Sequence, residues 1–334
     1  MINIFKNYNP FNFVFVILFS LIFWSYQLFF DEYQYIPSFE NEMPLFFYFS
    51  NFIFGFNSKF LSYLISFILI IIQLLIVIRI DAKYLFSHSR NFFTGFIFIL
   101  LSSISVITNH FSSIFFANIF LLLALKRVFE AYNKEKILSN FFDASFLISL
   151  ASLFYFNSIF LIIFLFIATL ILKSTPIKEW IVIIAGILMV YAIFFEIYFI
   201  IFGNVNGLFL IIKQTFSKQF QFNFSNLQFI TSSVIFSVIT LFSFFYFLKV
   251  SHTLNLYIRV FFRISIILFL VISVIFILAG TKNFELILFA VFPISIIASN
   301  FLINAKRKKI TELFFWLFFF SILFVHTIKI INIF

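Results

Sequence analysis

The stretch FLSYLISFILIIIQLLIVI at residues 60–78 decides the fold class of this chain, and the charged sequence RIDAK follows it at residues 79–83. An α-helix needs roughly 17 to 25 mostly apolar residues to cross a membrane, and this run has that length without a charged side chain. A transmembrane β-strand would alternate apolar and polar residues over about 10 positions. The stretch therefore predicts a membrane-spanning helix that ends at a charged boundary.

The whole chain has the same character. Of its 334 residues 64% are apolar and 10% are charged, which does not describe a water-exposed surface. In lipid the backbone must satisfy its own hydrogen bonds, so helices are expected throughout. We predict an all-α polytopic bundle that forms a single integral membrane domain over residues 1–334. Its eleven predicted spans are residues 11–30, 60–78, 91–107, 111–125, 137–156, 159–172, 180–202, 229–248, 264–279, 284–303 and 313–331.

Positive charge predicts the orientation of these spans. Alternate loops hold 17 of the 22 Lys and Arg residues, and such loops lie in the cytoplasm by the positive-inside rule. The amino terminus is therefore expected in the cytoplasm, and residues 11–30 are expected to be an uncleaved span. The predicted cytoplasmic cations are Lys6, Arg79, Lys83, Arg90, Lys126, Arg127, Lys134, Lys136, Lys173, Lys178, Lys249, Arg259, Arg263, Lys306, Arg307, Lys308 and Lys309.

Two outer segments are predicted to lie on the membrane surface. If residues 45–56 also spanned, every later loop would invert and leave 16 cations outside against six inside. We therefore expect residues 45–56 to be an interfacial or re-entrant helix within an outer loop at 31–59. In the second outer loop, at 203–228, residues 207–221 carry apolar side chains at helical spacing and predict another surface helix.

Composition excludes several function classes. The chain has no cysteine, which removes disulfides, thiolate metal sites and cysteine nucleophiles, and its four histidines are dispersed. We predict no metal centre, and the sequence indicates no cofactor. The net charge of +10 is explained by the cations of the predicted cytoplasmic loops. Nucleic-acid binding would need a soluble domain with a basic face, which the sequence does not indicate. The expected partner is the lipid bilayer.

The outer acidic loop contains the first candidate site. Asp31 and Glu32 directly follow the first span, with Glu40 and Glu42 in the same loop. One interpretation is a solvated acidic loop that helps to fix the topology. The other is a carboxylate at the membrane surface that accepts a proton from an acceptor hydroxyl or holds a divalent cation.

Other polar residues near the outer side extend this candidate site. Glu196 lies about six residues before the outer end of its span, and we expect it to face the same cavity as Asp31. His110, at the tip between two spans, is either a turn residue or a ligand. Glu285 is expected to pair with Lys282, and Asn118 and Asn157 are expected to join helices.

Several acids are expected to be ordinary charges on the cytoplasmic side. For Asp143 we expect a pair with Lys136 or a helix-capping role, and Glu130 and Lys134 have the spacing of a helical ion pair. The expected surface charges are Asp81, Glu130, Glu135, Glu179 and Glu312.

Four segments of the chain carry a resemblance to a known family. They are Phe5-Lys6 with Asn9-Pro10, Ala117-Asn118 before residues 121–125, Phe142-Asp143-Ala144 before residues 150–156, and Lys178-Glu179-Trp180. Over most of its length the chain resembles an uncharacterised family of multi-pass inner-membrane proteins from Bacteroidetes-type bacteria. This resemblance implies a location in the bacterial inner membrane.

A second resemblance is architectural. C-type polytopic glycosyltransferases are similar in having a first span, an acidic outer loop and surface helices before the second span, as in Asp31-Glu32 and residues 45–56 here. The resemblance implies Asp31 as catalytic base and Glu32 as helper. Lys213 and Lys218 would then be the candidates for binding the phosphate of a polyprenyl-linked sugar. From their own positions in the sequence, Glu196 and His110 are also predicted to bind the substrate.

Three functions follow from these observations. The first is a glycosyltransferase-like enzyme that uses a polyprenyl-phosphate-linked sugar at the outer leaflet. The second is a non-catalytic subunit or assembly factor of a cell-envelope complex, for which residues 31–44 are a docking loop. The third is a small-molecule transporter, although neither inverted repeats nor broken helices are evident.

Overall fold

The computed structural model describes residues 9–30, 43–54, 59–86, 91–104, 111–132, 137–172, 177–203, 227–250, 254–279, 285–305 and 308–331. Its long regular elements are all helices, which confirms the predicted all-α class. In chain order they are α2 (Pro10–Phe30), α3 (Pro44–Phe54), α4 (Lys59–Tyr84), α5 (Phe93–Ile104), α6 (Ser113–Glu130), α7 (Leu138–Phe154), the 3-10 helix η1 (Phe156–Leu161), α8 (Ile162–Leu172), α9 (Ile177–Phe202), α11 (Leu227–Val250), α12 (Leu256–Ala279), α13 (Ile287–Asn304) and α14 (Lys308–Ile331).

Each of the eleven predicted spans coincides with one of these helices, or with η1 and α8 together for residues 159–172. Within the described residues, four helices, α4, α9, α12 and α13, are long and apolar enough to cross a membrane. Several helices continue past the predicted apolar ends, because a helix need not stop where the hydrocarbon does. The chain is therefore a membrane protein built as an all-α bundle.

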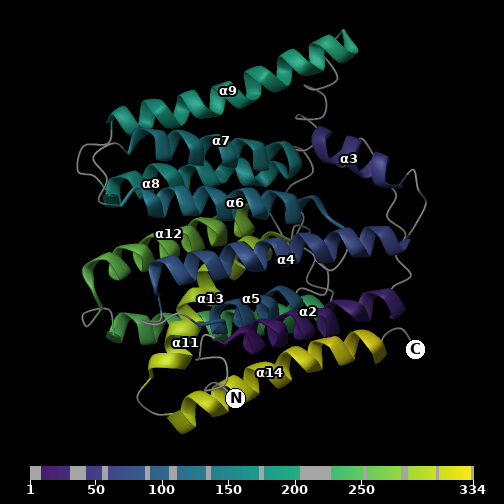
Figure 1. The fold of residues 1–334 in the computed structure, drawn as a ribbon, viewed down its shortest axis with the longest axis vertical. Helices are drawn as coiled ribbons and strands as arrows, with labels where there is room; N and C mark the ends of the chain where they lie inside the picture. Colours follow the sequence, from purple (N-terminus) through teal and green to yellow (C-terminus); the bar gives the residue numbers. More distant parts are fainter. Residues whose placement is uncertain are drawn as a thin grey trace.

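The bundle has a central helix and an edge helix (Figure 1). In α13, 89% of the apolar window is buried, and α5, α11 and α12 pack around it. In α9 only 17% of the window is buried, and this helix contacts α7 and α8 along one margin of the bundle. The two helices differ little in hydropathy, so packing decides that α13 lies at the centre of the bundle and α9 at its edge.

The predicted helix at residues 45–56 is confirmed as α3, which begins at Pro44 and ends at Phe54. Proline is favourable at the first helical position because its fixed φ suits the first turn and its missing N–H needs no partner there. Phe46 is buried, with its ring centroid 5.3 Å from that of Phe111 and 6.2 Å from that of Phe116. These rings attach α3 to α6. The predicted helix at residues 207–221 lies outside the described residues.

Amide side chains join α4 to α6 inside the bundle. Gln73 Nε2 donates to the carbonyl oxygen of Phe115 at 2.9 Å, and Asn118 Nδ2 donates to Gln73 Oε1 at 2.9 Å. Both amides are fully buried. Hydrogen bonds of this kind hold transmembrane helices together because lipid offers no alternative partner. The predicted role of Asn118 as a contact between helices is confirmed.

Candidate functional site

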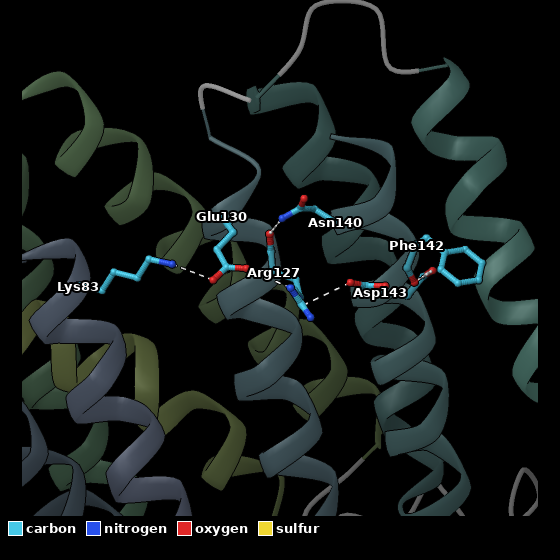
Figure 2. A network of polar contacts seen from close by, with 7 residues as sticks. Lys83, Arg127, Glu130, Asn140, Phe142 and Asp143 are labelled. Carbon is cyan, nitrogen blue, oxygen red and sulfur yellow. Dashed lines mark hydrogen bonds and ion pairs between the residues drawn. The ribbon is translucent and has the colours of Figure 1, made fainter. Parts of the chain in front are cut away.

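Charged side chains from α4, α6 and α7 form a connected network at one end of the bundle (Figure 2). We call this end, which holds Lys83, Arg127 and Arg259, the basic end. Glu130 lies at the centre of the network. Its carboxylate accepts a hydrogen bond from Lys83 Nζ at 2.8 Å and another from Arg127 Nη1 at 3.3 Å. Glu130 therefore connects the last turns of α4 and α6.

The network continues from α6 to α7. Arg127 Nε lies 3.4 Å from Asp143 Oδ2, and Asn140 Nδ2 donates to the backbone carbonyl of Arg127 at 3.0 Å. Arg127 thus contacts acidic groups on two helices. The sequence predicted Lys134 as the partner of Glu130 and Lys136 as a partner of Asp143. Both lysines lie outside the described residues.

The charge state of Glu130 follows from its neighbours. Partial burial by itself raises the pKa of the Glu130 carboxyl, but the hydrogen bond from Lys83 and the charges of Lys83, Arg127 and Lys126 lower it further than burial raises it. The net effect holds the pKa below the ordinary glutamate value, so the group is ionised at neutral pH. An ionised, doubly paired carboxylate accepts hydrogen bonds and is poorly suited to donate a proton.

An aromatic cluster lies beside the ion pair. The Phe261 ring of α12 is central, with its centroid 4.7 Å from that of Tyr84, 5.1 Å from that of Phe129 and 5.3 Å from that of Tyr132. Phe261 and Phe129 are almost fully buried. Tilted and edge-on ring pairs at these distances stabilise packing beyond the area they bury. The cluster brings the ends of α4, α6 and α12 together.

A cavity of about 690 Å³ opens between the ion pair and the aromatic cluster. Lys83, Tyr84 and Glu130 line it together with Tyr132 and Tyr257. The Lys83 ammonium lies 5.4 Å from the Tyr84 ring centroid, and the buried Tyr84 hydroxyl has no hydrogen-bond partner among the described residues. This arrangement can bind a planar or cationic group through the rings.

The residues predicted for the outer site are mostly beyond the described part of the chain. Asp31, Glu32, His110, Lys213 and Lys218 all lie outside the described residues. Glu196 is the described member of the set, and its side chain is exposed on α9. The outer catalytic site thus stays a prediction.

The structure corrects the prediction for two acids. Asp81 and Glu179 were expected to be surface charges, but they are 1% and 0% exposed. Thr94 Oγ1 of α5 donates to Asp81 Oδ2 at 2.9 Å and lies 3.0 Å from Ser299 Oγ of α13. Asp81 is therefore part of a polar cluster among three helices, because α4 continues as a buried helix beyond the predicted span.

Other acids are placed as follows. Glu312 is exposed on α14, in agreement with the prediction of a surface charge. Glu285 accepts a hydrogen bond from the Ser112 hydroxyl, which joins the start of α13 to the start of α6. Its predicted partner Lys282 lies outside the described residues, as does Glu135.

A signal for the burial of Asp81 was present in the sequence. Ile70, Leu74, Val77, Asp81 and Tyr84 follow one another at spacings of four and three residues, and all five are buried. Positions at this spacing share one face of a helix. Tracing the apolar stripe past Arg79 would have placed Asp81 on the packed face. The aromatic cavity had no such signal, because phenylalanine occurs throughout the chain.

Comparison with known proteins gives one match. No curated protein and no solved structure matches the chain. One family model, described as a family of unknown function (DUF6427), matches residues 80–334. The matched region contains Lys83, Glu130 and Phe261, and it begins after the acidic segment at residues 31–42 and after α3. Because the match covers most of the chain, the protein belongs to this family of unknown function.

Proposed function

We propose that this protein is a multi-pass protein of the bacterial inner membrane, with a cytoplasmic amino terminus, and that it serves as a non-catalytic subunit or assembly factor of a cell-envelope complex. The observation that carries this proposal is the position of Glu196 on the outward surface of α9. The basic end supports the proposed orientation, since it collects Lys83, Arg127 and Arg259 as cytoplasmic loops do.

After Lys178 in its first turn, the outward surface of α9 is strongly apolar apart from this carboxylate. Around Glu196 the neighbouring exposed side chains are Met189, Ile193, Phe199 and Ile200. Gly186, by contrast, packs against α7. Most of α9 therefore faces away from the bundle, and its side chains suit either lipid or another transmembrane helix.

A carboxylate on such a surface is unfavourable without a partner. Glu196 lies six residues before Phe202, which is about 9 Å from the end of the helix. An ionisable group at intermediate membrane depth costs about 1 to 3 kcal/mol, and such residues usually pair with a polar or charged group. The complementary occupant is a transmembrane helix of another envelope protein with a lysine or arginine at the same depth.

This proposal predicts a contact that depends on Glu196. A photoreactive benzoyl-phenylalanine placed at Ile193 is expected to crosslink in cells to a membrane protein with a basic residue in the crosslinked span. The adduct should be lost in Glu196→Leu and kept in Glu196→Asp, because only the carboxylate matches the partner charge. The measurement is mass spectrometry of the purified adduct.

A matched control uses Val274, which is exposed on α12, a helix that contains no Asp or Glu. The same photoreactive group there is expected to yield lipid adducts only. An Ile193 adduct that persists in Glu196→Leu would contradict the role of the carboxylate. An adduct with a second copy of this chain would contradict the proposed envelope partner and would show that the protein associates with itself through α9.

A second candidate function is the glycosyltransferase-like activity at the outer leaflet. The observation that favours it is α3, a short helix placed in sequence between the acidic loop and the second predicted span. Under this proposal Asp31 is the base and Glu32 its helper, while Lys213 and Lys218 bind the phosphate of a polyprenyl-linked sugar. Glu196 and His110 would contact the substrate.

The enzyme proposal predicts a change in lipid-linked sugars. In cells that carry Asp31→Asn, one polyprenyl-linked sugar is expected to accumulate by an order of magnitude, because removal of a general base slows transfer by about 10²-fold or more. Mass spectrometry of extracted lipids measures this. Glu312→Gln, which changes an exposed acid on α14, is the control and should leave the lipids unchanged. Unchanged lipids in Asp31→Asn at normal protein abundance would exclude this site.

A further inference from the structure

A second cavity at the basic end has a different chemistry from the aromatic one. It measures about 600 Å³ and lies between the last turns of α8 and α11 and the first turns of α12. Arg259 and Arg263 provide its charged part. The remaining wall is apolar and includes Leu170, Phe244 and Ile267. One cavity therefore combines cations at the membrane boundary with hydrocarbon along the membrane-embedded helices.

The two arginines are placed to act together. They stand four residues apart on α12, so their side chains leave the same face of the helix. Arg259 Nη2 donates to the carbonyl oxygen of Leu254 at 3.2 Å, which orients its guanidinium at the start of the helix. Arg263 is exposed, and no described carboxylate forms an ion pair with it. Its N–H donors are therefore available to a ligand.

The local field at this point favours an anion. The first turns of α12 carry the positive end of the helix dipole, and two arginines add to the same sign. Cations at a helix amino terminus are unfavourable unless a negative group compensates them. Lys249, exposed in the last turn of α11, adds further positive charge nearby. The planar fork of arginine matches a phosphate with two parallel hydrogen bonds, and phosphate is the anionic group that membrane lipids carry at this depth.

The apolar wall of the cavity is open to the side. Leu170 and Leu248 are 54% and 48% exposed, and Phe244 is also exposed. Beneath the opening, the Phe247 and Phe262 rings, with centroids 5.0 Å apart, join α11 to α12. A chain of methylene groups entering from the bilayer would therefore lie along α8 and α11 without displacing a packed core.

We propose that this cavity binds an anionic phospholipid of the inner leaflet, with the lipid phosphate on Arg259 and Arg263 and an acyl chain along Leu170 and Phe244. Basic pockets between transmembrane helices on the cytoplasmic side suit such lipids. A free phosphate would use the arginines but gain nothing from the apolar wall, so the lipid is the better match. This site does not depend on which partner or substrate the protein has.

The test is native mass spectrometry of the full-length protein with equal amounts of phosphatidylglycerol and phosphatidylethanolamine of the same acyl chains. The wild type is expected to retain phosphatidylglycerol about tenfold more strongly. Both lipids carry a phosphate, but the ammonium group of phosphatidylethanolamine would be repelled by the two arginines, whereas phosphatidylglycerol has no such cation. Arg263→Gln should remove most of this preference. Lys308→Gln, at an exposed position outside the cavity, should keep it. Equal retention of phosphatidylglycerol by wild type and Arg263→Gln would overturn the proposal.

Two further measurements separate a lipid from a soluble phosphate. Leu170→Trp fills the apolar wall without touching the arginines, and it is expected to weaken phosphatidylglycerol binding several-fold. Glycerol phosphate at millimolar concentration should not displace the lipid. Full displacement by glycerol phosphate, or no effect of Leu170→Trp, would show that only the phosphate is recognised and would contradict the lipid assignment. Thermal unfolding of each variant checks that it remains folded.

Discussion

Phe261→Ala is expected to lower the free energy of unfolding by about 3 kcal/mol, since truncating a buried phenylalanine typically costs about 3 to 5 kcal/mol. Phe261 is 3% exposed and its ring contacts Tyr84 and Phe129. Alanine would leave a cavity where α4, α6 and α12 meet. The Phe261 ring is packed against its neighbours, so the contacts that it makes with them would have no replacement.

The measurement is denaturant-induced unfolding of the purified protein in detergent, followed by near-UV circular dichroism. Phe245→Ala is the matched control because Phe245 is 66% exposed on α11 and should face lipid. We expect the control to change stability by less than about 1 kcal/mol. Equal destabilisation by the two variants would show that the aromatic cluster does not hold the basic end together.

Gly186→Leu is expected to detach α9 from α7 and to lower stability by about 2 to 3 kcal/mol. A Cβ at Gly186 would come within 3.0 Å of the Phe142 carbonyl oxygen and even closer to the Ser145 hydroxyl. The Ser145 side chain can rotate, but the backbone carbonyl cannot move without shifting α7. Small residues at such contacts allow transmembrane helices to approach closely.

Ala185→Leu is the control for this prediction, because Ala185 is the preceding residue and is exposed. Limited proteolysis and thermal unfolding in detergent should show an earlier release of α9 in Gly186→Leu and wild-type behaviour in Ala185→Leu. The same release in both variants would mean that α9 is held by something other than close packing at Gly186. The result also bears on the proposed partner, since Glu196 is carried by this helix.

The described structure places its charged cavities at the basic end. Both the aromatic cavity beside Glu130 and the arginine cavity beside Arg263 use the first turns of α12. The aromatic cavity suits a planar or cationic group. The arginine cavity suits an anion with an apolar tail.

Much of the fold followed from the sequence. Runs such as residues 60–78 predicted the helices, and the charge count excluded a span at residues 45–56, where the structure has the short helix α3. The environments of the acidic residues were harder to predict from the sequence. Asp81 was assigned to the surface because it follows Arg79, but its spacing from Val77 places it on the packed face of α4. Charge near a membrane boundary does not by itself distinguish a solvated loop from the end of a buried helix.

The candidate sites depended still more on tertiary structure. Lys83 and Glu130 are 47 residues apart, and nothing in their local sequence pairs them. Arg259 and Arg263 were predicted only as cytoplasmic cations, whereas the cavity beside them requires α8 and α11 as well. Residues that come from separate helices share no local sequence motif, so a contact between them cannot be predicted from their spacing in the sequence.

The sequence by itself determined that this protein is embedded in a membrane and that its apolar segments are helices. It also determined that most Lys and Arg residues lie in alternate loops between the predicted spans. Only the tertiary structure decided which helix lies at the centre. The apolar windows of α9 and α13 have mean hydropathies of 2.5 and 2.0, yet 17% and 89% of them are buried. In water an apolar face must be covered, but in a membrane lipid and protein interior are about equally apolar. Hydropathy therefore places a helix in the membrane, while shape and hydrogen bonding place it in the bundle.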